Sequence, residues 1–130
     1  MLLIATRVAP SAIHGLGVFA GQFIADGSPI WRFAPEFDRE FSPKQFSELP
    51  AQAQAHTRWF AFVNSQSGHW ILSGDHACFM NHSPRPNTGA LPNSVSPVTT
   101  VALRDIAAGE ELTCNYFAFD GHAKQKLGPV

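Results

Sequence analysis

Two glycines around a single residue mark the first segment of the sequence that is suited to chemistry. The segment reads HGLGVF, from His14 to Phe19. Glycine has no Cβ, so the backbone at Gly15 and Gly17 can lie close to a ligand. A dinucleotide-binding fingerprint would need a third glycine and a following helix. On its own, the pattern therefore predicts an ordinary turn beside a strand.

A polar, proline-locked segment follows an apolar stretch in the middle of the chain. It reads FMNHSPRPN, from Phe79 to Asn87. The side chains of Asn81 and His82 can donate and accept hydrogen bonds in fixed directions, as a binding site requires. An ordered loop that caps its own backbone with these side chains is the competing interpretation.

A third segment, GEELTCNY, runs from Gly109 to Tyr116 and is predicted to form a turn and a strand. Tyr116 is the only tyrosine in the chain, beside eleven phenylalanines and three tryptophans. Its hydroxyl therefore makes it a candidate for chemistry. A half-buried tyrosine that only packs is the competing interpretation.

The elements that position these segments must be short, because ten prolines and ten glycines punctuate the sequence. A helix is predicted to start at Ser42-Pro43, an N-cap followed by proline, and Pro50 ends it or begins a second helix. Residues 59–63 fit a helix or a strand, and residues 81–97 are predicted to be mostly loop. Strands or short apolar runs lie at residues 2–8, 18–20, 30–33, 69–72, 98–103 and 111–116.

Length and charge exclude several classes of protein. A chain of 130 residues with 45% hydrophobic residues is long enough for one folded domain. The net charge of −1 does not fit a nucleic-acid binder, and no run approaches the roughly 20 apolar residues that cross a bilayer. Residues 124–126 are predicted to be a solvated tail. Cys78 and Cys114, without a secretory signal, indicate reduced thiols and a cytoplasmic, non-secreted protein.

Taken together, the three segments resemble the SET-domain family of protein lysine methyltransferases. Their order and separation carry the resemblance, which extends over about residues 2–119. It implies a mainly β fold of several small sheets with little helix, and a knot-like crossing near the C-terminus. It also implies a single domain over residues 1–130, with residues 120–130 as a short tail.

The resemblance further implies an activity and a set of site residues. Family members move a methyl group from S-adenosylmethionine to a lysine that a partner protein presents, without binding nucleic acid or a membrane. Tyr116 falls on the catalytic tyrosine, and no residue is assigned to a metal. The implied cofactor-binding residues are His14, Gly15, Leu16, Gly17, Asn81, His82 and Phe117. The implied channel for the substrate lysine is lined by Phe60, Phe62, Phe79 and Cys114.

The sequence departs from the family pattern at several places, among them Asn115, where relatives usually carry Asp, and a short insert around residues 36–66. Many relatives carry Phe or Tyr at the position of Cys114, which leaves the number of methyl groups transferred open. The cysteine-rich zinc segment that follows the last strand in many relatives is missing. Phe117 or Phe119, or a second copy of the chain in a homodimer, would have to complete the cofactor site.

Three alternatives remain open at this point. A SET fold that binds peptide or cofactor without transferring methyl would keep the same motifs. A metal protein would use His76, Cys78 and His82, with His69 nearby, although zinc sites usually show tighter paired spacings. A Cys–His nucleophile pair at Cys78 has no sequence context that would activate the thiol.

Overall fold

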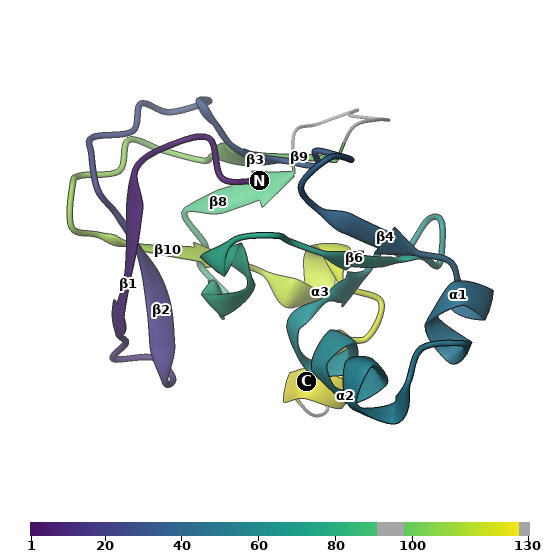
Figure 1. Cartoon of the computed structure of the whole chain (residues 1–130). Coiled ribbons are helices and arrows are strands. Elements are labelled where there is room, and N and C mark those ends of the chain that lie inside the picture. The colour runs from purple at the N-terminus through teal and green to yellow at the C-terminus, as the bar shows by residue number, and fades with distance from the viewer. Residues whose placement is uncertain (91–97, 128–130) are drawn as a thin grey trace.

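The computed structural model describes residues 1–90 and 98–127. Its strands are short, which is consistent with the frequent prolines and glycines, and they form three small sheets (Figure 1). The mainly β fold of several small sheets is therefore confirmed. The strands are β1 (Thr6–Pro10), β2 (Leu16–Ala20), β3 (Pro29–Arg32), β4 (Arg39–Phe41), β5 (Phe62–Val63), β6 (Trp70–Leu72), β7 (Asn81–His82), β8 (Thr88–Ala90), β9 (Thr99–Ala102) and β10 (Glu111–Cys114).

The sheet that carries the three motifs has the strand order β1-β2-β10-β7. β1 and β2 form an antiparallel hairpin, and β10 joins β2 antiparallel. β7 then pairs with β10 in parallel, with Thr113 opposite Asn81 and Cys114 opposite His82. The two segments predicted to cross near the C-terminus therefore lie side by side.

Two further sheets of three strands each complete the described part of the fold. One has the order β3-β9-β8, and the other has the order β4-β6-β5. Figure 1 shows the β1–β2 hairpin at one side of the molecule and β4 with α1 (Pro43–Ser47) at the other, with β10 running between them.

The predicted helix start is confirmed at Ser42. The backbone N–H of Gln45 donates to Ser42 Oγ at 3.1 Å, and Ser42 N donates to Gln45 Oε1 at 2.8 Å. This reciprocal capping box satisfies two backbone donors that the helix leaves unpaired. Pro50 separates α1 from a second helix, α2 (Ala51–Phe60), and the ambiguous run 59–63 divides between that helix and β5.

The loop predicted over residues 81–97 is wrong in part. Residues 81–82 and 88–90 form strands β7 and β8, whereas residues 91–97 lie outside the described residues. β7 depends on a partner that is distant in sequence, β10, and β8 pairs with the next strand, β9. A polar segment of two or three residues gives no periodic signal from which such pairing could be predicted.

The C-terminal segment also differs from the prediction. Tyr116 starts a short helix, α3 (Tyr116–Phe119), instead of ending a strand, because Asn115 caps the helix by accepting from Phe117 N. A further helix, α4 (Ala123–Leu127), occupies the predicted tail. The solvated-tail prediction is wrong for Lys126, whose side chain is only 15% exposed.

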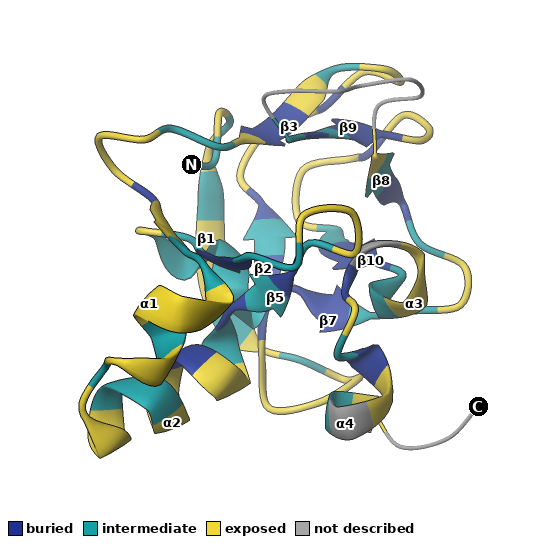
Figure 2. Cartoon of the chain, turned by 90° about the vertical axis from the view of Figure 1, so that its right-hand side faces the viewer, coloured by how far each residue is buried: buried dark blue, intermediate teal, exposed yellow. Residues whose placement is uncertain are grey.

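Two clusters of buried side chains hold the fold together. The larger joins β2, β10 and the segment before β7, and Phe79 and Tyr116 pack against it. The smaller one centres on Trp70, which stacks on Phe46 with 4.2 Å between the ring centroids. Figure 2 shows buried residues on β7 and β10 in the interior, whereas α1 and α2 present mostly exposed residues.

Within residues 1–90 and 98–127, none of the helices has the length and apolar character needed to cross a membrane.

Candidate functional site

A cavity of about 860 Å³ lies where the three motif segments meet. Its volume falls in the usual range for sites that bind small organic molecules. Most of the residues implied by the family resemblance line this one cavity, so the fold brings together segments that are about 100 residues apart in sequence. They are His14, Gly15, Leu16, Phe60, Phe62, Phe79, Asn81, His82, Cys114 and Tyr116.

The side chain of Asn81 positions the turn between β1 and β2. Its Nδ2 donates to the carbonyl of His14 at 3.0 Å and to the carbonyl of Leu16 at 3.1 Å. Between them, Gly15 adopts a left-handed conformation with φ of 46°, which residues with a Cβ rarely adopt. Asn81 therefore fixes the backbone that forms one wall of the cavity.

Glu111 anchors this arrangement from β10, a role that the sequence analysis missed. Its carboxylate accepts from Asn81 Nδ2 at 3.0 Å and from the hydroxyl of Ser11 at 2.8 and 2.9 Å. The hydrogen bonds link the turn, β7 and β10 in one network. The sequence signal that was available is the position of Glu111 in the Gly-Glu-Glu-Leu segment. A glutamate at this position does not by itself indicate which side chains its carboxylate will bind.

Gly17 lies outside the residues that line the cavity, in contrast to the other residues of its turn. A Cβ at this position would collide with Oε2 of Glu111 and would lie 3.1 Å from Cβ of Ser11. Glycine is therefore needed here so that the backbone can approach the Glu111 network closely. The contacts support an indirect role for Gly17 in positioning the turn.

His82 connects the polar motif to the start of α3. Its Nδ1 accepts a hydrogen bond from the backbone N–H of Tyr116 at 3.1 Å. With Nδ1 acting as acceptor, the neutral imidazole carries its proton on Nε2. The rings of Tyr116 and Phe117 lie 5.5 and 5.4 Å from the His82 ring, so the imidazole is held between them.

The hydroxyl of Tyr116 donates to the backbone carbonyl of Met80 at 2.6 Å. Burial raises the pKa of Tyr116 well above its ordinary value, and the nearby Cys114 and Asp120 raise that pKa further. The phenol therefore stays protonated at neutral pH. Tyr116 is placed as a neutral hydroxyl at the cavity wall, with an oxygen that can also accept weak contacts.

Cys114 is buried where many relatives carry an aromatic residue. Its Sγ lies 3.9 Å from the carbonyl oxygen of Asn81. Burial, together with the nearby Asp120 carboxylate, raises the pKa of the thiol to about 12. A thiol with this pKa is not a nucleophile at neutral pH. Burial also raises the pKa of the half-buried Cys78, so neither cysteine fits a nucleophilic role.

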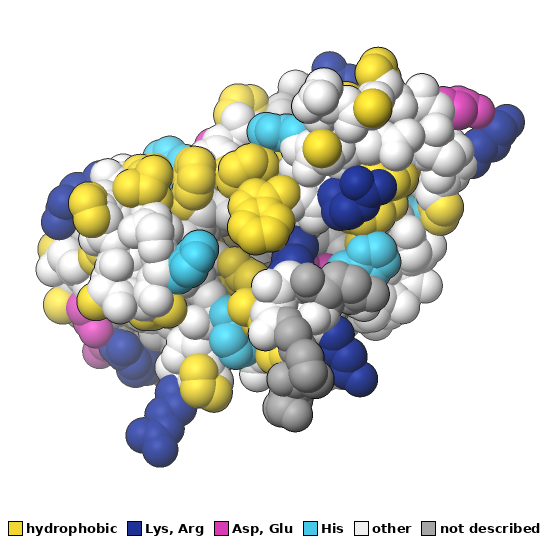
Figure 3. Space-filling model, turned by 90° about the horizontal axis from the view of Figure 1, so that it is seen from below, with side chains coloured by type: hydrophobic (Ala, Val, Ile, Leu, Met, Phe, Trp, Pro, Cys, Tyr) yellow, Lys and Arg dark blue, Asp and Glu magenta, His cyan; other side chains and the backbone are white. Residues whose placement is uncertain are grey.

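Aromatic residues from α2 and its neighbours form the apolar part of the cavity. Phe60 and Phe79 meet edge to face with 5.7 Å between their ring centroids, and Phe62 meets Trp31 at 6.4 Å. The underside of the molecule, where the β1–β2 turn, α2 and α4 lie, gathers hydrophobic side chains with histidines among them (Figure 3). The exposed apolar side chains that line the cavity are Ile13, Leu16, Trp59, Leu103 and Leu127.

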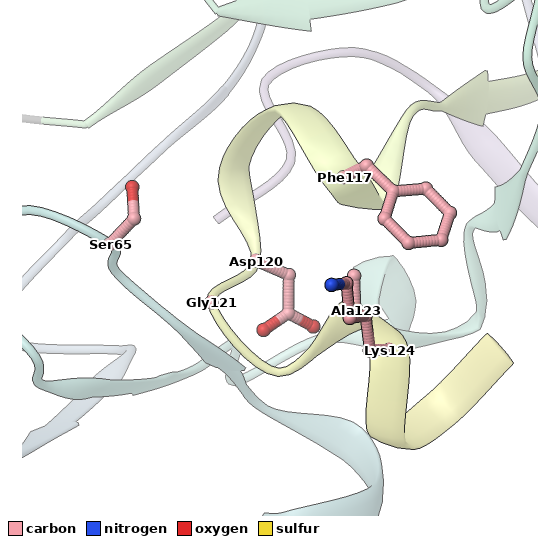
Figure 4. Close-up of a pocket in the computed structure, with 6 residues that line it drawn as sticks. All are labelled: Ser65, Phe117, Asp120, Gly121, Ala123 and Lys124. Carbon is pink, nitrogen blue, oxygen red and sulfur yellow. The ribbon is translucent and has the colours of Figure 1, made fainter. Parts of the chain in front are cut away.

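Phe117 lines a second, smaller cavity of about 390 Å³ and lies outside the lining of the first. Figure 4 shows its ring beside Lys124 and Ala123 of α4, with Asp120 below. It contacts the main site through the His82 ring. The side chain of Phe119, the other residue considered as a cover for the cofactor, lies outside the described residues.

The histidines of the alternative metal set each have a different partner. His69 Nδ1 lies 2.6 Å from Glu40 Oε2, and His76 Nε2 lies 2.6 Å from Thr6 Oγ1. His82 accepts from Tyr116 N, as described above. Among residues 1–90 and 98–127, no three His, Cys, Asp or Glu side chains gather as metal ligands would.

Two further residues of the site, Asp120 and Lys126, were also missed by the sequence analysis. Both line the main cavity, and Lys126 Nζ lies 2.8 Å from Asp120 Oδ2. Asp120 Oδ1 also accepts from Val63 N at 3.0 Å, which ties the C-terminal segment to β5. Val63 and Asp120 are 57 positions apart, so no local pattern could predict this contact.

The fold and the cavity together define a SET domain. The model of the SET domain family matches residues 15–117, which include the second and third motif segments and all of the first except His14. The chain therefore belongs to the SET domain family, and the resemblance found in the sequence is confirmed.

Several proteins are similar to this chain. “Putative histone-lysine N-methyltransferase 1” of Plasmodium falciparum (isolate 3D7) is 26% identical over 125 residues, covering 92% of this chain and 2% of that protein. Among solved structures, Chaetomium thermophilum Polycomb Repressive Complex 2 in an autoinhibited conformation bound to S-adenosylmethionine has a TM-score of 0.68 and 22% identity, covering 95% of this chain and 16% of that chain. A “putative histone methyltransferase” of P. falciparum has a TM-score of 0.61 and 18% identity, covering 88% and 95%.

Proposed function

We propose that this chain is an S-adenosylmethionine-dependent protein lysine N-methyltransferase. The observation that carries the proposal is that one cavity contains the β1–β2 turn, Asn81, His82 and Tyr116. The presence of all of these groups in one cavity argues against a fold that only binds and has lost its activity. Relatives of the SET domain family whose names specify histone-lysine methylation support the same activity.

The residues of the cavity fit the cofactor that the proposal requires. S-adenosylmethionine supplies an electrophilic methyl group on a sulfonium. The backbone of the turn at His14–Leu16 and the polar groups of Asn81 and His82 would hold it, and the surrounding apolar side chains would exclude water. Asn81 contributes mainly by fixing the turn, because its Nδ2 is already hydrogen-bonded to two carbonyls there.

The apolar side of the cavity suits a lysine that must lose its proton before it can attack. A free lysine has a pKa of about 10.4, and an apolar channel beside a positive charge lowers that pKa. Phe60 and Phe79 provide aromatic walls, and the neutral Tyr116 hydroxyl can orient the amine and the methyl through weak contacts. Alignment at near-attack distance would then supply most of the rate enhancement.

The proposal specifies the substrate only by its class, which is a protein that presents a lysine. The names of the similar proteins refer to histones, but this chain spans 2% of the curated relative and 16% of the Polycomb chain. From the two free thiols we propose a non-secreted protein that is located in the cytoplasm or wherever its substrate protein resides.

The experiment is incubation of the whole chain with cell lysate and S-adenosylmethionine carrying an isotopically labelled methyl group. Mass spectrometry should find the label on Nζ of lysine side chains, and the label should depend on added protein. Label on a different type of residue would contradict the proposal. Cofactor binding without any transfer would favour the alternative, a SET-fold binding module.

A further inference from the structure

Lys126 is the one lysine of the chain that lines the main cavity. The sequence contains three lysines, at positions 44, 124 and 126. Lys44 has a side chain that is 86% exposed, and Lys124 is also exposed, whereas the Lys126 side chain is 15% exposed. Burying a lysine is costly unless its ammonium has partners, so its position in the cavity needs an explanation.

The amine of Lys126 lies among the residues implied for the substrate-lysine channel. Its Nζ donates to the carbonyl of Ala61, which is the residue between Phe60 and Phe62. It also lies 6.0 Å from the centroid of the Tyr116 ring. The chain therefore places one of its own amines beside the tyrosine that is proposed to orient a substrate amine.

Two features hold Lys126 at this position. Asp120 accepts from its Nζ at 2.8 Å, and Asp120 itself is fixed by Val63 N. Lys126 also follows Tyr116 by only ten positions, so the short segment with α3 and α4 tethers the amine to the site. A tethered amine has a high effective concentration, which favours its reaction over that of an amine on a separate protein.

We propose that Lys126 is a methyl acceptor for the active site of its own chain, an inference that rests on the proposed function. In this step the ammonium of Lys126 gives a proton to the Asp120 carboxylate and on to solvent. A bond then forms between Nζ and the methyl carbon of S-adenosylmethionine. The bond between that carbon and the sulfonium breaks, and its electron pair stays on sulfur, leaving S-adenosylhomocysteine.

The test is incubation of the whole chain with S-adenosylmethionine alone, followed by peptide mapping. We expect methylation at Lys126 to exceed that at Lys44 and Lys124 by about tenfold or more, because the other two are exposed and outside the cavity. The methylated fraction per unit time should not change when the protein is diluted about tenfold, since the reaction is intramolecular. Equal labelling of the three lysines, or a rate that falls with dilution, would overturn the proposal.

A parallel incubation with lysate separates this inference from the proposed function. Methylated lysate proteins with an unmodified Lys126 would overturn the inference and leave the proposed function standing. No methyl transfer to either would count against both. Lys126→Arg should lose self-methylation and Lys124→Arg, a matched change on the same helix, should keep it. One further outcome would contradict the acceptor role: Lys126→Arg increases methyl transfer to lysate proteins, and the wild type does not methylate itself. In that case Lys126 only blocks the channel.

Discussion

The Tyr116 hydroxyl donates to the Met80 carbonyl at 2.6 Å, and this contact orients the phenol at the cavity wall. We expect Tyr116→Phe to reduce kcat by about a hundredfold, as is common when a group acting mainly in the transition state is removed. Affinity for S-adenosylmethionine should change little. The lost hydrogen bond should cost about 1 kcal/mol of stability.

Initial rates and melting temperatures of Tyr116→Phe and Tyr116→Ala check this prediction. If Tyr116 only packs, the Phe variant keeps full activity and the Ala variant loosens the domain. A well-folded, fully active Tyr116→Phe protein would therefore remove Tyr116 from the proposed chemistry.

Cys114 makes the stability of the chain sensitive to alkaline pH. Burial raises the pKa of its thiol from an ordinary value of 9.0 to about 12. Between these values the unfolded chain releases the proton and the folded chain keeps it. Stability that is fully present below pH 9 is therefore lost as the pH rises toward 12. Burial of Tyr116 acts in the same direction above that residue's ordinary pKa of 10.

Urea unfolding at pH 8 and pH 10 measures this effect. We expect a smaller loss of unfolding free energy between the two pH values in Cys114→Ala than in the wild type, because the variant lacks the buried thiol. An identical loss in both proteins would show that Cys114 does not cause the alkaline sensitivity.

At the scale of elements, the turn between β1 and β2 depends on a close approach to β10. Gly17→Ala would place a Cβ against Oε2 of Glu111 and force that carboxylate away from Asn81. We expect a loss of about 1 kcal/mol of stability from overpacking and a roughly tenfold weaker affinity for S-adenosylmethionine.

Gly121→Ala provides the matched control, because a Cβ there would make only ordinary contacts of 3.5 Å or more. Calorimetric affinities of the two variants should differ accordingly. Unchanged affinity in Gly17→Ala would show that the Glu111 network does not position the cofactor wall.

The C-terminal helices are held to β5 through Asp120. Its side chain is 2% exposed, pairs with Lys126 and accepts from Val63 N. Asp120→Ala should destabilise the chain by about 3 kcal/mol, because it leaves a mostly buried ammonium without its partner. Asp120→Asn keeps an oxygen for Val63 N and should cost less. Chemical unfolding that ranks the two variants equally would contradict this account of the segment.

The sequence predicted those helices and strands that have a local signal, such as a helix cap or a β-branched run. The cap at Ser42 gave the start of α1, and the β-branched run before Leu103 gave β9. The first strand was placed at residues 2–8 but lies at Thr6–Pro10, since Leu2 instead bridges to Trp31 of β3. Strand β7 and helix α4 could not be predicted, because their partners are far away in sequence. Strand β8 pairs with the next strand but is too short to give a periodic signal.

The same distinction applies to the site. The motif resemblance placed Asn81 and Tyr116 in one site, and both line the main cavity. It did not indicate that Asn81 holds the turn through two carbonyls or that Glu111 anchors it. These roles depend on the geometry of side chains across three strands. A sequence motif specifies which residues are present, and the fold determines which of them touch the ligand.

At the scale of the whole molecule, the chain encloses its cavity with its own C-terminal segment. Lys126 and Leu127 of α4 line the cavity, so this segment provides part of its wall. A homodimer remains a prediction, and analytical ultracentrifugation of the whole chain would measure it.

The measurement that tests the central claim most directly is a calorimetric titration of the whole chain with S-adenosylmethionine. The account predicts one bound molecule per chain. Binding should weaken in Asn81→Ala, because this change releases the turn at His14 and Leu16. Binding should persist in the control Asn64→Ala, because the Asn64 side chain accepts from Gln66 and Ser67 outside the cavity. At about 1 mM cofactor, even a binding free energy of a few kcal/mol is detectable. The account would be contradicted by a well-folded chain that shows no binding at this concentration.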